Sequence, residues 1–292
     1  MDHADDVADG SLTFVIPVRD AAGVSDWLGA MDLLRVTIAS CLAQDAGGHP
    51  RVAIGASRDD PLPEIPSGVV IGFVDHRWAP LPDEPQECMA ATRRDKGLRM
   101  AAALRAAQPR GHVMVVDWDD LVSPRLAAWV SAHPRAHGWY GESAYVFNEG
   151  PLALRIPAGA HRLFGSTIIQ RWDLARAPAP DGDVDPAWAD QVYGSHVMSV
   201  GLHAQCGTPL EPLPFDVGAY RVGTGQNVSG FDSPFRVVRA ALGVPRRRWP
   251  LLVRPRRQVR RFGPARSGGR GCRSSGQGRR RVTLSRISRR SS

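Results

Sequence analysis

Short apolar runs rich in β-branched residues recur through residues 1–120, with helical patterns between them. Runs of this length, bounded by polar and turn residues, are typical of strands that are buried on both faces. They span 12–18, 51–57, 68–75 and 112–117, and helical spacing predicts helices over 31–44 and 93–107. The order of strand, helix, strand, strand, helix, strand predicts an α/β fold with a mostly parallel sheet flanked by helices.

Polar residues follow each of the four apolar runs. The carboxyl ends of parallel strands meet at one edge of a sheet, and ligands of such sheets bind beyond that edge. The residues in question are Arg19 and Asp20, Ser57 to Asp60, Asp75 and His76, and Asp117 to Asp120. We therefore expect the functional site at this edge.

The second half of the chain is less regular. Residues 138–147 and 152–156 predict paired strands, and 164–169 is a further apolar segment. An amphipathic helix is expected within 185–204, and 212–220 is expected to be extended. No internal repeat is visible in the sequence.

Charge divides the chain at about residue 236. Residues 1–235 carry 18 Lys and Arg and 29 Asp and Glu, for a net charge of −11. Residues 236–292 carry 19 Arg and no acidic residue, and Gly and Ser are frequent there. We expect one folded domain over 11–230, and a disordered basic tail over 236–292, because such a composition does not build a packed core.

Three interpretations of the basic tail stay open. It is a polycation that associates weakly with an anionic membrane, a segment with a specific nucleic-acid role, or an out-of-frame translation of a GC-rich gene. Its only aromatic residues are Trp249 and Phe262, so stacking on bases is poorly supported. We therefore expect no specific nucleic-acid partner.

The sequence favours a cytoplasmic protein without a disulfide framework. No apolar run approaches the roughly 20 residues that span a bilayer. Residues 1–11 are acidic and lack the basic and apolar regions of a secretory signal. The cysteines lie far apart and lack the CxxC spacing of zinc sites. They are Cys41, Cys88, Cys206 and Cys272.

The most distinctive chemical pattern is the acidic segment that follows the fourth apolar run. Asp117, Asp119 and Asp120 stand where a strand gives way to a loop. Clustered carboxylates at such a point suit a hard divalent cation, Mn²⁺ or Mg²⁺, whose remaining ligands are diphosphate oxygens. The alternative is that Asp119 and Asp120 only begin a turn or cap a helix that starts near Ser123.

Several segments taken together resemble the family-2-type glycosyltransferases of the GT-A fold. The segments are VIPVRD at 15–20, RRDKGLRMAAAL at 93–104, VVDWDD at 115–120, and the GSHV, GTPLEPLPF and YRVG segments within 194–223. They are most similar to a group of bacterial glycosyltransferases that share the R-x-D-K-G, D-x-D-D and G-S-H segments. The resemblance covers about 11–230 and does not extend into the basic tail.

The resemblance implies a hexosyltransferase with a nucleotide-diphosphate sugar donor and a saccharide or other hydroxyl acceptor. By position it places the nucleotide against Pro17, Val18 and Arg19. It places the metal and diphosphate at Asp117, Asp119 and Asp120, with Asp119 as the preferred metal ligand.

The resemblance also brings the start of the second helix close to the donor. That segment holds Arg94, Asp95 and Lys96, and Lys96 is the only lysine of the chain. The alternative is that this segment is a solvated helix start. His196 in the G-S-H segment is a further metal ligand or phosphate contact, or else a structural histidine.

Two departures from the family leave other roles open. The family often has an acidic pair before the distal helix, whereas this chain reads VDPAWADQVYGSH. Asp190 is therefore the first candidate and Asp185 the second for the base that deprotonates the acceptor. The second strand also lacks the acidic residue with which many relatives read uracil, and Asp59 is the nearest substitute.

Three functional hypotheses follow. The first is an inverting, metal-dependent glycosyltransferase. The second is a non-catalytic α/β module that docks to nucleic acid or anionic lipid through its basic tail. The third is a nucleotidyltransferase, but such enzymes usually carry a Gly-rich loop with a lysine directly after the first strand, and this chain has Arg19-Asp-Ala-Ala-Gly-Val there.

Overall fold

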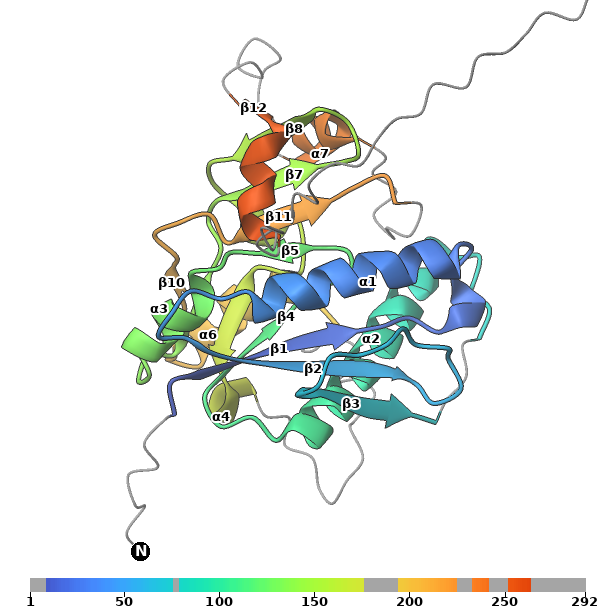
Figure 1. Ribbon diagram of the computed structural model, residues 1–292, viewed down its shortest axis with the longest axis horizontal. Helices are drawn as coiled ribbons and strands as arrows, with labels where there is room; N and C mark the ends of the chain where they lie inside the picture. The colour runs from blue at the N-terminus through green and yellow to red at the C-terminus, as the bar shows by residue number, and fades with distance from the viewer. Residues whose placement is uncertain (1–8, 76–78, 176–193, 225–232, 242–251, 264–292) are drawn as a thin grey trace, which may run out of the picture.

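The computed structural model describes residues 9–75, 79–175, 194–224, 233–241 and 252–263. Within them the strands form a seven-stranded and a five-stranded sheet, with helices packed around both (Figure 1). The chain is therefore an α/β protein with helices flanking its sheets, as the sequence predicted. Both sheets are mixed, whereas the sequence predicted one mostly parallel sheet.

The parallel half of the larger sheet carries the four predicted strands. They are β1 (Ser11–Pro17), β2 (His49–Ser57), β3 (Val69–Val74) and β4 (His112–Val115). Their order is β4-β1-β2-β3, and β1 pairs in parallel with both β2 and β4. The other half adds β9 (Ile168–Arg171), β6 (Gly138–Tyr140) and β10 (Glu211–Pro212), and β9 is antiparallel to β4 and to β6. The sheet is thus parallel where the sequence pattern is regular and mixed elsewhere.

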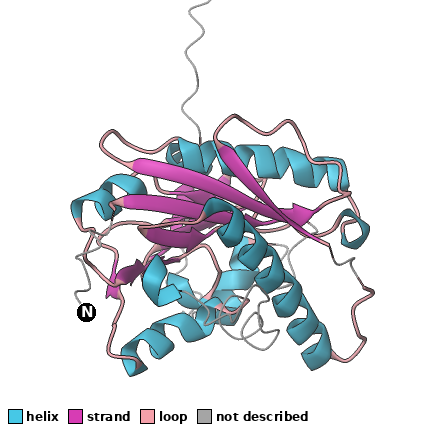
Figure 2. Cartoon of the chain, turned by 90° about the horizontal axis from the view of Figure 1, so that it is seen from below, coloured by secondary structure: helices cyan, strands magenta, loops and turns pink. Residues whose placement is uncertain are grey.

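Alternate residues of the central strand face opposite layers of helices (Figure 2). Leu12, Phe14 and Ile16 belong to the core cluster that contains residues of α1 (Trp27–Leu42) and α3 (Leu126–Ala132). Val15 belongs to a second cluster, with residues of α2 (Pro85–Ala107). Residues of both layers are buried, which is why these strands read as continuous apolar runs.

Two glycines let α2 approach the sheet at backbone distance. A Cβ on Gly55 of β2 would lie 1.9 Å from the carbonyl oxygen of Arg99, and one on Gly72 of β3 would lie 2.0 Å from that of Ala102. No real side chain tolerates such contacts, so the helix backbone occupies the space of two side chains. This seating fixes the position of α2, which carries several of the residues predicted to bind a ligand.

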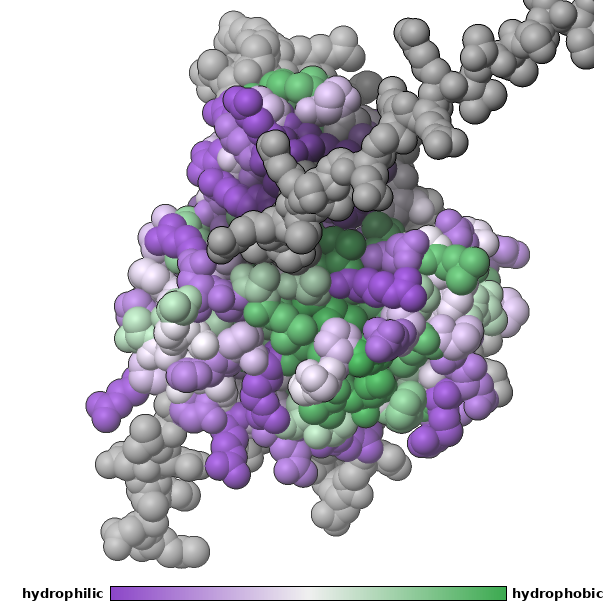
Figure 3. Space-filling model, viewed as in Figure 1, coloured by the Kyte–Doolittle hydropathy of each residue, from purple (hydrophilic) through white to green (hydrophobic). Residues whose placement is uncertain are grey.

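The connection from β2 to β3 contains no helix, although a crossover between parallel strands usually does. Residues 58–68 run along the α1 side of the sheet, where Leu62 and Ile65 are partly buried against the core. The Trp27 indole N–H donates to the Pro61 carbonyl oxygen at 3.1 Å. These contacts show that a loop packs on this face where a helix usually would. Figure 3 shows hydrophobic residues on the surface beside α1.

The smaller sheet has the order β12-β8-β7-β11-β5. Its strands are β5 (Leu121–Val122), β7 (Ala144–Phe147), β8 (Leu152–Ile156), β11 (Gly218–Arg221) and β12 (Val253–Pro255). Strand β5 follows β4 after only a few residues, so the acidic segment 117–120 lies where the chain passes from one sheet to the other. The short helix α4 (Trp172–Ala175) packs beside β4 and β9 of the larger sheet. Helix α6 (His196–Gln205) is joined to the same sheet by the contact of His203 Nε2 with Gln170 Oε1 of β9 at 2.9 Å.

Part of the expected tail is folded against the smaller sheet, which corrects the prediction that disorder begins at residue 236. Helix α7 spans Pro234–Ala241. Strand β12 pairs antiparallel with β8, and the 3-10 helix η5 (Arg256–Phe262) follows it. Residues 242–251 and 264–292 lie outside the described residues, so the expectation of disorder there stays a prediction.

Apolar contacts and charge pairs together explain why this arginine-rich stretch folds. Phe262 is buried in a cluster with Tyr145 and Phe147. The guanidinium of Arg261 contacts Asp216 at 2.6 Å, and that of Arg256 contacts Glu149 at 2.7 Å. Residues 236–292 are mostly polar, so their composition gave no sign of the few apolar residues that pack on the sheet. Acidic residues of the body form ion pairs with some of the arginines.

No helix in the described part of the chain combines the length and the hydrophobicity that a membrane span requires.

We expect Gly72→Ala to destabilise the protein, because its Cβ would overlap the backbone of α2. Overpacking of this kind costs about 1–3 kcal/mol of unfolding free energy. Urea denaturation measures it, with Gly201→Ala as the matched control, because a Cβ on Gly201 of α6 has nothing within 4 Å. Equal stability of the two variants would contradict the close contact between the α2 backbone and Gly72.

We expect Phe262→Ala to lose about 3 kcal/mol, because a buried aromatic side chain leaves a cavity when truncated. Phe73→Ala, at a side chain 39% exposed, is the control with a smaller loss. The same denaturation assay checks both variants. Equal losses would show that residues 252–263 do not pack on the body.

Candidate active site

The candidate site lies where the strand order reverses. From β1 the chain proceeds to β2 and β3 on one side, and then through α2 to β4 on the other side of β1. In open α/β sheets, ligands bind in the crevice at such a switch point, beyond the carboxyl ends of the strands. A cavity of about 240 Å³ occupies this place.

Segments far apart in the sequence line the cavity. They come from the end of β1, from α2, from the acidic segment after β4, from the turn before β9, from the start of α6 and from β11. The lining residues are Pro17, Arg19, Met89, Thr92, Arg93, Asp95, Lys96, Arg99, Asp117, Trp118, Asp119, Leu163, Phe164, Gly165, Gly194, His196 and Tyr220.

A Lys96–Asp117 ion pair lies at the centre of this lining. The ammonium Nζ is 2.5 Å from Oδ1 of Asp117, and the two side chains are 24% and 29% exposed. Burial alone would raise the pKa of Asp117, but the Lys96 ammonium, His196 and Arg19 outweigh it and lower this pKa. Asp117 is therefore held as a carboxylate, and the pair stays charged at the cavity surface.

Gly165 leaves the space that this pair occupies. A Cβ on Gly165 would lie 3.1 Å from Nζ of Lys96, 3.2 Å from Oδ2 of Asp117 and 3.7 Å from Nδ1 of His196. The three polar side chains therefore gather around a position without a side chain. Burial, and then the charge of Lys96, lower the pKa of His196 to about 4. The imidazole is thus neutral, and its buried Nε2 has no hydrogen-bond partner among the described residues.

Asp119 also borders the cavity, but its pKa is shifted in the opposite direction to that of Asp117. Its Oδ2 accepts a hydrogen bond from the Thr224 hydroxyl at 3.2 Å. Burial, together with the neighbouring charge of Asp117, raises the pKa of Asp119 to about 7. The two acids of the D-x-D segment thus differ: the Lys96 ammonium lowers the pKa of Asp117, whereas the pKa of Asp119 is raised although the charge of Arg221 acts against this change.

Asp120 points away from the cavity and holds the two sheets together. The Ser166 hydroxyl donates to its Oδ2 at 2.6 Å, and the Arg221 backbone N–H of β11 donates to its Oδ1 at 3.1 Å. The same Ser166 oxygen accepts the backbone N–H of Asp117 at 2.9 Å. Both oxygens of this fully buried carboxyl are satisfied within the protein, so its place is structural, contrary to the expectation of a metal ligand.

Buried hydrogen bonds fix the α2 side of the cavity. Arg99, only 1% exposed, makes a two-bond contact with Asp95 at 2.9 and 3.0 Å. A third bond joins it to the Ser57 hydroxyl at 3.0 Å, and Ser57 donates to Asp20 at 2.9 Å. Asp95 is thereby a partner of Arg99, and it also faces Arg19. Burial lowers the pKa of the Arg19 guanidinium, while the carboxylates of the cavity oppose this change.

The remaining predicted residues lie elsewhere. Val18 is buried in the core beside α1, whereas Pro17 and Arg19 on either side of it border the cavity. Asp59 and Arg94 are exposed and are not among the described residues that line the cavity. Asp185 and Asp190, the candidates for the base, lie outside the described residues, so that assignment stays a prediction.

The sequence reasoning missed the turn Gly165-Ser166 and two aromatic residues of the cavity wall, Phe164 and Tyr220. The rings of Phe164 and Tyr220 stack at 4.9 Å with an interplanar angle of 6°. A Gly-Ser pair directly before an apolar run was the available signal, because small residues there permit close approach of other segments.

The described residues do not fit the expected metal site. They contain no group of three His, Cys, Asp or Glu side chains close enough to hold an ion together. Of the four predicted ligands, Asp120 is saturated by protein donors, Asp117 is paired with Lys96, and His196 lies beside the same ammonium. Asp119 borders the cavity, and the charges of Arg221 and Arg19 act on it.

We expect Ser166→Ala to destabilise the protein by about 1–3 kcal/mol, because it leaves a buried carboxyl oxygen without its donor. Chemical denaturation measures the loss. Ser67→Ala, at an exposed loop position, should change stability by less than about 0.5 kcal/mol. Equal stability of the two variants would refute the structural role of Asp120.

No protein-family model matches this chain, and a search of the curated proteins finds no match either. The resemblance to glycosyltransferases therefore rests on the sequence segments themselves and stays a prediction.

Proposed function

We propose that this protein is a glycosyltransferase of the GT-A fold, which moves a sugar from a nucleotide-diphosphate donor to an acceptor hydroxyl. One observation carries the proposal. A cavity at the switch point of the parallel strands is lined by the D-x-D acids Asp117 and Asp119 and by the basic side chains of Arg19 and Lys96. Fold and position indicate a nucleotide ligand, and the basic residues indicate that it is anionic.

The basic side chains supply the contacts that a diphosphate needs. Arg19 enters from the end of β1, and Arg93 and Lys96 enter from α2. Guanidinium groups bind phosphate oxygens in pairs, and an ammonium binds them as a compact charge. The neighbouring acids limit the net positive charge, which favours a ligand that also carries hydroxyl groups.

The aromatic lining supplies apolar surface for a base or a sugar ring. Trp118 lies between the two acids of the D-x-D segment and packs on Trp27, with ring centroids 6.3 Å apart. Tyr220 borders the cavity from β11 and is backed by Phe164. Rings held rigidly in this way stack on flat ligands at little entropic cost.

The proposed reaction is a single displacement. The acceptor oxygen attacks the anomeric carbon, the bond from that carbon to the diphosphate oxygen breaks, and the electron pair leaves on the diphosphate. The acceptor proton passes to a carboxylate base, for which Asp190 and then Asp185 are the candidates. Attack from the face opposite the leaving group inverts the configuration at the anomeric carbon.

The docking-module hypothesis is weaker than the transferase proposal on one observation. Arg256 and Arg261 of the predicted tail are paired with Glu149 and Asp216 of the body. That part of the positive charge is paired with acids of the body, so a polyanion would gain less from it. Binding of an anionic membrane or of nucleic acid therefore becomes an outcome to be tested.

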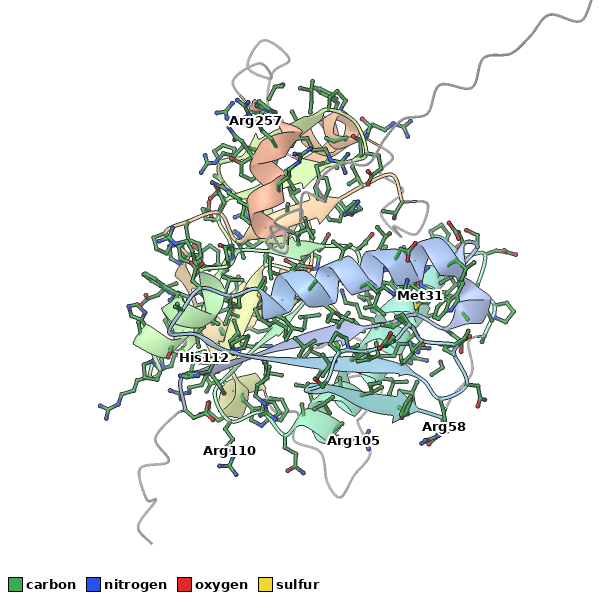
Figure 4. The ribbon with its side chains drawn as sticks, viewed as in Figure 1. Met31, Arg58, Arg105, Arg110, His112 and Arg257 are labelled. Atoms are coloured by element: carbon green, nitrogen blue, oxygen red, sulfur yellow. The ribbon has the colours of Figure 1, made fainter. Side chains whose placement is uncertain are left out.

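We expect the melting temperature of the full chain to rise with UDP-, GDP- or dTDP-sugars of one nucleotide class, because a ligand of the native state stabilises it. Arg19→Gln should weaken that binding about 10- to 100-fold, the value of one charge-assisted contact. Calorimetric titration gives the affinities. Arg58→Gln is the control, because Arg58 is exposed beyond β2 and pairs with Asp75 (Figure 4).

Release of the nucleoside diphosphate by the same donor would establish turnover. If no donor shifts the melting temperature of the folded chain, with or without Mn²⁺, the transferase proposal fails. Salt-sensitive binding of the same sample to anionic vesicles or to RNA would then favour the docking module.

A further inference from the structure

The Lys96 ammonium stands where a divalent cation was expected. It contacts Asp117, the first acid of the D-x-D segment, at 2.5 Å, and the pair is partly exposed to the cavity. An ammonium has three N–H donors, and the contact with Asp117 uses one of them. The side of the ammonium that faces the cavity can therefore meet an anionic group of a ligand.

The position is shaped for a lysine. Lys96 is the single lysine among 37 Lys and Arg residues, so arginine is the usual cation of this chain. Its ammonium fits against Gly165, where even a Cβ would lie 3.1 Å from Nζ. A planar guanidinium with its five donors is larger than an ammonium and needs more room. The compact ammonium fits beside Gly165 and borders the cavity.

The same arrangement disfavours a metal ion beside Asp117. An ion bound to that carboxylate would lie within a few ångströms of the ammonium, and like charges at such distances repel strongly in a partly buried site. Asp120 is directed into the protein, and His196 sits beside the ammonium around Gly165. The chemistry of the donor set therefore favours the lysine as the resident cation.

We propose that Lys96, held by Asp117 and seated against Gly165, binds the diphosphate of the ligand through its remaining N–H donors, so that binding does not require Mn²⁺ or Mg²⁺. The inference rests on the proposed function, because it assumes a nucleotide diphosphate in this cavity. It assigns to a side chain of α2 the role that the sequence analysis gave to a metal ion.

The test measures the affinity of the full chain for UDP, GDP and dTDP by calorimetry, once with EDTA and once with Mn²⁺. We expect the nucleotide that binds to do so within about twofold in the two conditions. Lys96→Met should weaken binding in EDTA by about 10-fold or more, the value of one contact between a charge and a phosphate. Arg105→Met, on the same helix but at its exposed end, is the matched control (Figure 4).

Asp119→Asn gives a second readout that leaves Lys96 in place. A metal site would lose an anionic ligand, and binding in Mn²⁺ would fall. The lysine inference predicts unchanged or tighter binding, because a negative charge near the phosphates is removed. The metal explanation predicts weaker nucleotide binding by Asp119→Asn, and the lysine explanation does not. This result does not depend on the stability of Lys96→Met.

The outcomes separate the role of Lys96 from the transferase proposal. Binding that appears only with Mn²⁺, or that Asp119→Asn abolishes, overturns the role of Lys96 and leaves the transferase proposal standing. Binding in EDTA that Lys96→Met leaves unchanged also overturns that role. No binding of any nucleotide in either condition overturns both.

Discussion

The rest of the structure depends on the hydrogen bonds of one buried carboxyl group. Asp120 receives the Ser166 hydroxyl and the Arg221 backbone N–H, and Ser166 also fixes the backbone of Asp117. Three segments distant in sequence thus meet at a single side chain. Removing such a group from water is costly unless each oxygen is satisfied, which here requires that both sheets be in place. The cavity exists because this junction sets the acidic segment at its rim.

Complementary charge links the two compositional halves of the chain. The acidic body and the arginine-rich segment behave as one folded unit where they meet, since Glu149 and Asp216 receive Arg256 and Arg261. Each exposed pair contributes little alone. The buried aromatic contacts of Phe262 supply the larger part of the stability, and the charges set where the segment lies.

Local patterns predicted the parallel half of the sheet well, because Leu12, Phe14 and Val15 are all buried and apolar runs record that directly. The carboxyl-edge rule and the family resemblance also pointed to Lys96, Asp117 and His196, which the structure brings together. The direction of Asp120 could not be predicted, since it depends on Ser166 and Arg221 from distant segments. Neither could the folding of residues 252–263, where the burial of Val259 and Phe262 outweighs an unfavourable composition.

The backbone contact of α2 with the sheet at Gly55 and Gly72 has a mechanical consequence. A helix seated on two strands without intervening side chains has no compressible layer beneath it, so it cannot slide or tilt without breaking those contacts. Lys96 and Asp95 therefore lie on a rigidly held helix, and a ligand must fit their positions. The turn at Gly165 adjoins Lys96 and is followed by Ser166, which is fixed to Asp120 and Asp117, so two sides of the cavity are held by buried contacts.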